Sequence, residues 1–253
     1  MQTHSRRALC TSGLHLLLGS ALLQYAARAN AIEGSLKWAA RPWLERLDEA
    51  STALSAGALP PASWQAEVEA VLRQMDFRDL LASLDFERLA ATAKFPGRGE
   101  GMERLYFLEA DGRIQPLRFR PFLFTLRRDL AVVPHGHHNM ATMHLVLAGR
   151  ARVRHFDRLE TTDTHMLIRA TSDHLAAPGD VSSISDQLNN VHWFQGLSDH
   201  VFMFNIGVYQ VNPTAPYGER DYVDPLGAES VGDGTLRAVR MGRQEAYEKY
   251  GHA

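Results

Sequence analysis

A succession of short strand-like runs between residues 105 and 211 is the feature that most constrains the fold of this chain. The runs are Leu105–Glu109, Ile114–Phe119, Phe122–Leu126, Met143–Leu147, Ala151–Phe156, His165–Ala170, Val181–Ile184 and His200–Val211. Turn-forming residues such as Asp111-Gly112, Gly149 and Pro178-Gly179 separate them. Short strands with such punctuation are typical of an all-β barrel or sandwich. We therefore expect a mainly β fold over residues 102–253, with a loop-like tail that ends in a short helix from Arg243 to Tyr250.

Helical periodicity precedes these runs and fills residues 32–94. Ser63 is the expected N-cap of one helix, and an amphipathic run from Asp76 to Ala93 predicts another, because its apolar residues recur on one broad face. The glycine-rich segment 95–101 is expected to be a loop. We interpret residues 32–101 as a helical flank that packs against the barrel.

Composition narrows the class of protein. The 253 residues are 45% hydrophobic and 22% charged, which suits a folded protein with a substantial core rather than a disordered chain. The formal net charge is -2, and no block of five or more like charges occurs. Binding to phosphate backbones needs concentrated Lys and Arg, so a general nucleic-acid-binding role is disfavoured.

The first 31 residues have the three parts of a signal peptide. Ser5-Arg6-Arg7 supplies a basic start, Leu14 to Leu23 an apolar stretch, and Ala29-Asn30-Ala31 a cleavage site before Ile32. The start resembles a twin-arginine export signal, which implies passage through the twin-arginine machinery to the periplasm. Ten apolar residues are too few for stable membrane insertion. The alternatives are an amphipathic helix and an uncleaved anchor. Cleavage would remove Cys10, the only cysteine, and any metal would then need His, Asp or Glu ligands.

Histidines gather in one part of the sequence. His135 and His137 are two residues apart, so on a strand both side chains face the same way and can bind one metal ion. His192, in a later segment, is the candidate for the third ligand. Three neutral imidazoles would leave coordination positions open for a substrate and a small oxidant. Taken singly, each histidine could instead be a hydrogen-bonded structural residue.

Two motifs surround these histidines. His-x-His is followed twelve residues later by Gly149, the next strand ends in the aromatic-Asp pair Phe156-Asp157, and His192 lies within Asn190-Val191-His192-Trp193-Phe194. The motifs resemble those of the cupin superfamily, and within it those of the thiol dioxygenases of the plant cysteine oxidase and cysteamine dioxygenase type, whose second motif is Asn-Ile-His-x-Phe. The resemblance covers roughly Pro121 to Val208. It implies a cupin-type jelly-roll barrel, Fe(II) as cofactor, and insertion of dioxygen into a small thiol.

The chain departs from these families around the expected substrate. Thr142 occupies the place where many cupins have a glutamate ligand, which favours a neutral site of three histidines. Asn205 stands where the plant-type family has an acidic residue, and Val208-Tyr209-Gln210 replaces its Pro-Pro-Tyr. A substrate different from the family's is therefore expected.

Further candidates follow from strand parity. His144 shares parity with Thr142 and should face the barrel interior, as a proton donor, an alternate ligand or a buried structural residue. Asn205 and Tyr209 share parity on a later strand and are expected to face inward, with Tyr209 able to orient oxygen. His138 faces away from His137 and is not an expected ligand.

The sequence thus predicts an exported non-heme cupin that binds a metal, most simply Fe(II), through His135, His137 and His192. Catalysis would involve His144 and Tyr209, and substrate would contact Thr142 and Asn205. Three imidazoles also accept Zn, Ni, Cu or Mn. Two other functions stay open: a non-catalytic cupin that binds a metal or ligand, and a metal-dependent isomerase or hydrolase on the same barrel. The sequence predicts no oligomeric state.

Overall fold

The computed structural model describes residues 35–36 and 41–252. The predicted signal peptide, with its cleavage site between Ala31 and Ile32, lies outside the described residues. The described chain forms two units. In the smaller unit, β1 (Ser35–Leu36) pairs in parallel with β3 (Tyr106–Phe107). The hairpin predicted here is only partly right: the chain turns at Gly112, whose φ is +80°, but it closes through a single bridge from Leu108 to Ile114.

The larger unit is built around eight antiparallel strands. They are β4 (Arg120–Arg127), β5 (Ala131–Gly136), β6 (Met140–Ala148), β7 (Ala151–Thr161), β8 (His165–Ala176), β9 (Val181–Ile184), β10 (Val191–Gly196) and β11 (His200–Tyr209). The first pairs with the last, β4 with β11, and the nested pairs β5 with β10, β6 with β9 and β7 with β8 follow. This nesting is the strand order of a jelly roll. The predicted cupin-type barrel is therefore confirmed.

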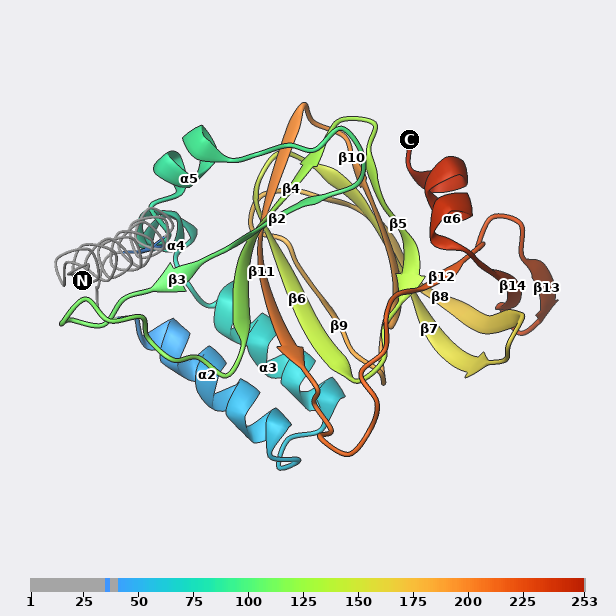
Figure 1. Cartoon of the computed structure of the whole chain (residues 1–253), viewed down its shortest axis with the longest axis horizontal. Coiled ribbons are helices and arrows are strands. Elements are labelled where there is room, and N and C mark those ends of the chain that lie inside the picture. The colour runs from blue at the N-terminus through green and yellow to red at the C-terminus, as the bar shows by residue number, and fades with distance from the viewer. Residues whose placement is uncertain (1–34, 37–40, 253) are drawn as a thin grey trace, which may run out of the picture. The chain divides into compact units, whose positions relative to one another are not determined.

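The eight strands divide between two sheets that face each other (Figure 1). One has the order β2-β4-β11-β6-β9, where β2 is Gly101–Arg104; the other contains β5-β10-β7-β8. A buried apolar cluster fills one part of the interior, with Phe124, Val132, Phe194 and Met203 among its members. Because side chains alternate across a strand, the residues that share parity with this cluster also point inward. This rule places His144 and His192 inside the barrel, two residues before the inward Val146 and Phe194. His135 has the opposite parity to Val132, and it lies opposite His192 because the register between β5 and β10 shifts between these positions.

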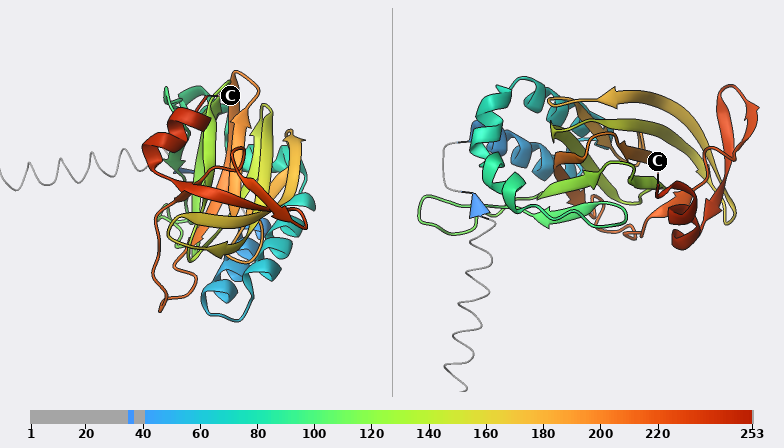
Figure 2. Two further views of the ribbon diagram at one scale, coloured as in Figure 1. Left: turned by 90° about the vertical axis from the view of Figure 1, so that its right-hand side faces the viewer. Right: turned by 90° about the horizontal axis from the view of Figure 1, so that it is seen from above.

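Helices cover the outer face of the five-stranded sheet (Figures 1 and 2). They are α2 (Pro42–Ser55), α3 (Pro61–Arg73), α4 (Phe77–Ser83) and α5 (Phe86–Thr92). Helix α3 is attached to β9 because the buried Gln65 Nε2 donates to Ser183 Oγ at 3.2 Å and Gln65 Oε1 accepts from Ser185 Oγ at 2.5 Å. None of the described helices is long and apolar enough to cross a membrane.

Two details of the helical prediction are wrong. Ser63 is not an N-cap, because α3 already begins at Pro61, where proline costs no hydrogen bond in the first turn. The expected single helix from Asp76 to Ala93 is two short helices. The chain breaks between them at Asp85, which has a left-handed φ of 50°.

The tail after Asn212 is not loop-like, which corrects another prediction. It contains β12 (Asp221–Val223), β13 (Glu229–Gly232) and β14 (Thr235–Met241) before α6, which spans Arg243–Tyr250 as predicted. Strand β14 extends the second sheet beside β8, and β12 pairs with both β14 and β5. Tyr222 of β12 lies opposite His135, so the tail forms part of the wall around the histidine cluster.

Candidate metal centre

The structure brings three of the predicted residues together. His135 lies on β5, His137 directly after its end, and His192 on the neighbouring strand β10, where it is the cross-strand partner of His135. One ligand-capable atom from each side chain lies within 4.8 Å of the others. Among the described residues this is the only group of three or more His, Cys, Asp or Glu side chains so arranged. The cluster contains no carboxylate.

Backbone contacts orient two of the imidazole rings. His135 Nδ1 lies 2.8 Å from the carbonyl oxygen of Val133, and His192 Nδ1 lies 3.4 Å from that of Asn190. A carbonyl only accepts, so Nδ1 carries the proton in the first contact and is favoured to do so in the longer one. Such contacts fix the tautomer of metal-binding histidines and leave Nε2 as the ligand atom.

The donor atoms have the spacing that a metal ion requires. His135 Nε2 and His137 Nε2 are 3.0 Å apart. Two nitrogens bound at right angles, each about 2.1 Å from an ion, would be about 3.0 Å apart. His135 Nε2 carries a lone pair, which would repel a second lone pair on His137 Nε2 at this distance. Either a cation shared by the two nitrogens or a proton on His137 Nε2 removes this repulsion. Three imidazoles without thiolate or carboxylate suit Fe, Zn, Cu or Ni.

Burial keeps these rings neutral at physiological pH. Desolvation lowers the pKa of His137 to about 3 and holds the pKa values of His135 and His192 well below the usual range. The neighbouring imidazoles and the guanidinium of Arg220 lower them further. A neutral imidazole offers the lone pair that a metal ligand needs, so the cluster is ready to bind a cation without first releasing protons.

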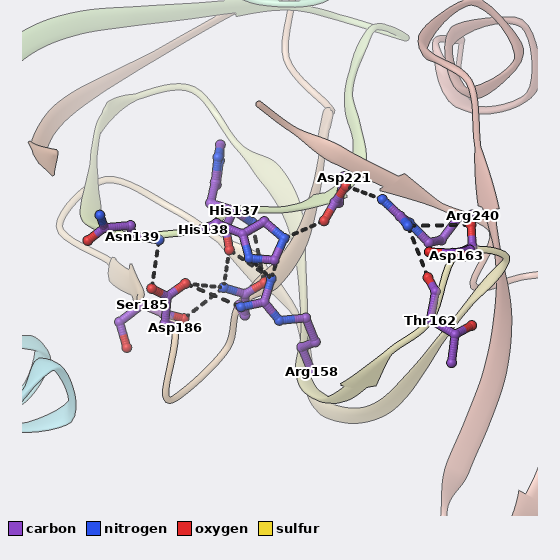
Figure 3. Close-up of polar contacts among 11 residues, drawn as sticks. His137, His138, Asn139, Arg158, Thr162, Asp163, Ser185, Asp186, Asp221 and Arg240 are labelled. Atoms are coloured by element: carbon purple, nitrogen blue, oxygen red, sulfur yellow. Dashed lines mark hydrogen bonds and ion pairs between the residues drawn. The ribbon is translucent and has the colours of Figure 1, made fainter. Parts of the chain in front are cut away.

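A polar network holds the backbone of His137 in place (Figure 3). Asn190 Nδ2 and Arg158 Nη1 each donate to the carbonyl oxygen of His137 at 2.9 Å. The backbone N–H of His137 donates to Asn190 Oδ1 at 3.3 Å. A Cβ on Gly136 would lie only 2.5 Å from that Oδ1, so the His-Gly-His sequence allows the amide to approach. From the sequence, Asn190 was expected only as part of a motif, and Arg158 was not predicted.

His138 points away from the cluster, and its surroundings fit its expected exclusion from the ligands. Its Nε2 lies 2.5 Å from Asp221 Oδ2, and Arg240 Nη2 donates to the other carboxylate oxygen at 2.7 Å (Figure 3). These contacts connect the segment after β5 to β12 and β14. Asp221 was not singled out from the sequence, because its role depends on strands in the tail that were not expected.

A cavity of about 980 Å³ opens beside the histidine cluster. His137 and His192 line it, and so do the four other site residues predicted from strand parity: Thr142, His144, Asn205 and Tyr209. Sequence parity therefore placed a set of side chains from β6 and β11 on one surface. The cross-strand pairs His144 with Asn205 and Thr142 with Gly207 show how the register produces this surface.

Thr142 and Asn205 use most of their hydrogen-bonding groups in contacts between barrel strands. Thr142 Oγ1 donates to the carbonyl oxygen of Ile206 at 2.8 Å. Asn205 Nδ2 donates to Thr142 Oγ1 at 2.7 Å and to the carbonyl oxygen of Met143 at 2.9 Å. The hydrogen bonds join β6 to β11. They leave Asn205 Oδ1 as the group of this pair most able to accept a hydrogen bond from a ligand.

His144 and Tyr209 differ from this pair, because neither has its polar atoms occupied by the barrel. His144 is buried, its pKa is lowered to about 3 by desolvation, and its Nδ1 has no hydrogen-bond partner in the described structure. Burial and the nearby Tyr217 raise the pKa of Tyr209, which therefore keeps its proton. Arg120 lies over the ring of Tyr209, 4.9 Å from its centroid. A neutral imidazole and a phenol thus face the cavity from neighbouring strands.

The jelly-roll strand order and the cluster of three imidazoles together define a cupin-type barrel with a candidate metal centre. No protein-family model matches the chain, and no curated protein matches it by sequence. Solved structures with partial likeness include an oxalate oxidase, with 13% identity and a TM-score of 0.34 over 46% of this chain and 53% of the other. A cupin superfamily protein from Desulfitobacterium hafniense DCB-2 has 18% identity and a TM-score of 0.30, over 48% and 87%. Procruciferin, an 11S globulin from Brassica napus, has 14% identity and a TM-score of 0.30, over 42% and 23%.

Less than half of this chain takes part in each of these alignments, and they span about half of the oxalate oxidase and a quarter of procruciferin. The assignment of the fold therefore depends on the strand pairing described above.

Proposed function

We propose that this protein is a non-heme iron dioxygenase that binds Fe(II) through His135, His137 and His192 and converts a thiol to a sulfinic acid. The convergence of three neutral imidazoles beside a large cavity with both polar and apolar walls carries the proposal. In the overall reaction R–SH and O₂ combine to R–SO₂H, so both oxygen atoms enter the product and no further reductant is needed. The sequence resemblance to thiol dioxygenases supports the choice of substrate.

The absence of a carboxylate in the described cluster matters for this chemistry. A site of three neutral ligands keeps the full positive charge of a divalent ion, which favours binding of an anionic thiolate. Iron at this position would supply open coordination sites for sulfur and dioxygen and the electron transfer between them. Thr142 cannot add a charge, and its hydroxyl is already bonded to the carbonyl oxygen of Ile206.

His144 is the residue best placed to hydrogen-bond the bound substrate. A thiol must lose its proton to bind as thiolate, and a divalent ion would lower the thiol pKa so that this proton leaves to water. His144, with a pKa of about 3, stays neutral and can donate a hydrogen bond to the thiolate or to the rest of the substrate. Its Nδ1 is buried without a partner, which leaves Nε2 as the nitrogen that can meet a substrate in the cavity. Tyr209 keeps its phenolic proton and can donate a hydrogen bond from its side of the cavity. The apolar ring of Phe124 packs edge-on against His144, with ring centroids 5.4 Å apart, and limits the movement of its ring.

Metal analysis is the first test. The wild-type protein, purified from its own host and then incubated with Fe(II) without oxygen, should contain one metal ion per chain. His135→Ala, His137→Ala and His192→Ala should each lose it, since a site with one of three ligands removed holds a divalent ion weakly. His155→Ala is the matched control, because this buried histidine is the cross-strand neighbour of His192 outside the cluster. Full metal content in His192→Ala, with loss in His144→Ala, would assign the third ligand to His144.

Oxygen consumption is the second test. Iron-loaded protein should take up oxygen with a thiol and form the sulfinate, identified by a mass increase of two oxygen atoms. The panel is cysteine, cysteamine, 3-mercaptopropionate and a peptide with an N-terminal cysteine. A protein that holds iron and consumes no oxygen with any thiol is not a thiol dioxygenase. A metal-binding cupin without turnover would then be the better description.

We also propose that the enzyme acts in the periplasm after removal of residues 1–31 by way of the twin-arginine machinery. The basic start, the short apolar stretch and the Ala-Asn-Ala site support this proposal. Export of a folded protein would allow metal to be inserted before the protein leaves the cytoplasm.

A further inference from the structure

The cavity beside the histidine cluster is much larger than a small thiol needs. Its volume of about 980 Å³ is at the upper end of the range of about 300–1,000 Å³ that is usual for sites binding drug-sized molecules. A molecule the size of cysteine would leave most of this space to water. A molecule that fills the cavity would therefore also contact walls far from the histidines.

Three arginines line the cavity: Arg98, Arg220 and Arg243. They come from three separate segments, namely the glycine-rich loop 95–101, the approach to β12 and the start of α6. After α5 the chain crosses toward the side of the barrel where β5 and α6 lie and returns as β2, which brings the loop to α6 (Figure 1). The ring of Tyr247 joins the segments, with the guanidinium carbons of Arg98 and Arg243 4.8 and 6.0 Å from its centroid.

Two carboxylates, Glu100 and Glu219, also line the cavity, so the three guanidinium groups leave an excess of one positive charge. Arg220 forms an ion pair with Glu100, with Nη2 2.5 Å from Oε1. In the part of the chain that is described, Arg98 and Arg243 have no ion pair. A single excess charge suits a monoanion, whereas Glu100 and Glu219 would oppose a dianion such as phosphate.

Strand pairing places Arg220 next to the histidines. The following residue, Asp221, is the cross-strand partner of Gly136, which lies between His135 and His137, and Arg220 lines the same cavity as His137 and His192. Its side chain is 26% exposed and that of its partner Glu100 is 7% exposed. A guanidinium has five N–H donors in a planar fork, and this ion pair leaves several of them free to face the cavity. Glu100 thus holds Arg220 in one orientation while the fork stays available.

We propose that the substrate is an organic acid whose carboxylate binds to Arg220 while its reacting group lies at the three histidines. A planar guanidinium can donate two parallel hydrogen bonds to the two oxygens of a carboxylate, whereas the ammonium group of lysine acts as a point charge. Arg98 and Arg243 attract the same anion at the rim. The proposal rests on the proposed function in placing the reacting group, but recognition of the carboxylate can be tested without turnover.

The test compares the binding of 3-phenylpropionate with that of 3-phenylpropanamide, which has nearly the same shape and no charge. Calorimetry is carried out on the protein as purified and after anaerobic addition of Fe(II). A charge-assisted hydrogen bond contributes about 1.5–3 kcal/mol, so the acid should bind roughly ten- to a hundredfold more tightly than the amide. Arg220→Gln should remove this preference by weakening the acid alone, and Arg220→Lys should keep part of it.

Controls separate recognition from folding and from direct binding to metal. Arg220→Gln leaves the buried Glu100 without its cation, which could disturb the fold. The double variant Glu100→Gln/Arg220→Gln is therefore measured as well, and it should lose the preference for the acid as Arg220→Gln does. Arg237→Gln removes an exposed arginine that pairs with Glu229 and should change nothing. A preference for the acid that survives Arg220→Gln but is absent without iron would mean that the carboxylate binds the metal, and would overturn the proposal. Equal affinities for acid and amide, or no binding of either, would overturn it too.

The thiol panel distinguishes failure of this inference from failure of the proposed function. If 3-mercaptopropionate is oxidised faster than cysteamine and 2-mercaptoethanol, and Arg220→Gln abolishes the difference, both proposals hold. Binding of acids through Arg220 without oxidation of any thiol would remove only the dioxygenase. Equal oxidation of all three thiols, unaffected by Arg220→Gln, would remove only the carboxylate site.

Discussion

Asn190 binds both backbone groups of His137 with one side chain. Its Nδ2 donates to the carbonyl oxygen at 2.9 Å, and its Oδ1 accepts from the N–H at 3.3 Å. The same Nδ2 also donates to the carbonyl oxygen of Ser185 at 3.1 Å. Asn190 thus ties the segment after β5 to the start of β10, two residues before His192 on the other side of the cluster. The separation between two candidate ligands therefore depends on one buried amide.

Asn190→Asp should weaken metal binding while leaving the three histidines intact. The aspartate keeps one acceptor oxygen but replaces the Nδ2 donor with a second oxygen, which faces the carbonyl oxygens of His137 and Ser185. Changes in the groups that orient metal ligands cost about 10- to 100-fold in affinity, and we expect a loss in that range. Competition with a chromophoric chelator would measure it.

Asn189→Asp is the matched control for this prediction. It makes the same chemical change one residue away, on a side chain that contacts Thr171 and the backbone of Ser183 instead of His137. Its φ of 57° is one that aspartate tolerates. Equal metal affinity in the two variants would show that Asn190 does not position His137.

Strand parity explains how much of the candidate site could be predicted from sequence. The period of two on β6 placed Thr142 and His144 on one face, and the same rule placed Asn205 and Tyr209 together on β11. Pairing of β6 with β11 could not be predicted, because His144 and Asn205 are 61 residues apart and nothing local specifies their register. The resemblance to cupins implied a jelly-roll barrel, but the pairing of these two strands was not predicted.

The part of the site formed by Arg220 and Asp221 depends on short strands that no local sequence pattern predicts. Arg220 and Asp221 follow a stretch rich in Pro, Gly and Asn that predicts a loop, and β12 is only three residues long. A strand this short forms because its neighbours β5 and β14 offer backbone groups on both sides. Arg158 was missed for a related reason: β7 runs to Thr161, beyond the Phe156 at which the predicted strand ended.

His144→Ala should slow turnover without removing the metal. A hydrogen bond from neutral His144 to a charged substrate contributes about 1.5–3 kcal/mol, so we expect kcat with thiols to fall about 10- to 100-fold, with metal content unchanged. His144→Gln should recover part of this loss, since its amide can also donate a hydrogen bond. The measurement is oxygen uptake under saturating thiol together with metal analysis of the same sample. Unchanged kcat in His144→Ala would assign this histidine to packing against Phe124 and Phe194.

Export should depend on the paired arginines near the start of the chain. Arg6→Lys combined with Arg7→Lys keeps the positive charge but changes the residues that the twin-arginine machinery reads, so precursor should accumulate in the cytoplasm. The wild-type protein from the periplasm should begin at Ile32 on N-terminal sequencing. A periplasmic protein that still carries Met1, or unchanged export of the double variant, would contradict the signal peptide.

The metal-free protein should lose stability as the pH falls below about 6.5, and His155 should account for part of the loss. Desolvation lowers the pKa of this buried histidine to about 3, and its Nε2 has no hydrogen-bond partner in the described structure. In the unfolded chain a histidine takes up a proton near pH 6.5, whereas folded His155 stays neutral until about pH 3. The unfolded state therefore binds more protons between these values, and the free energy of unfolding decreases as the pH falls.

One such group changes stability by at most about 1.4 kcal/mol per pH unit, so His155 should contribute a loss of about 2 kcal/mol between pH 6.5 and 5. His155→Gln removes the ionisable group while keeping a partner for Ser172, whose Oγ lies 2.9 Å from His155 Nδ1. Urea unfolding of chelator-treated protein at the two pH values should show a smaller loss in His155→Gln by about this amount. The control His200→Gln changes an exposed histidine that does not contribute to the pKa of His155, and it should leave the loss as in the wild type. The same loss in His155→Gln as in the wild type would mean that His155 is protonated in the folded protein.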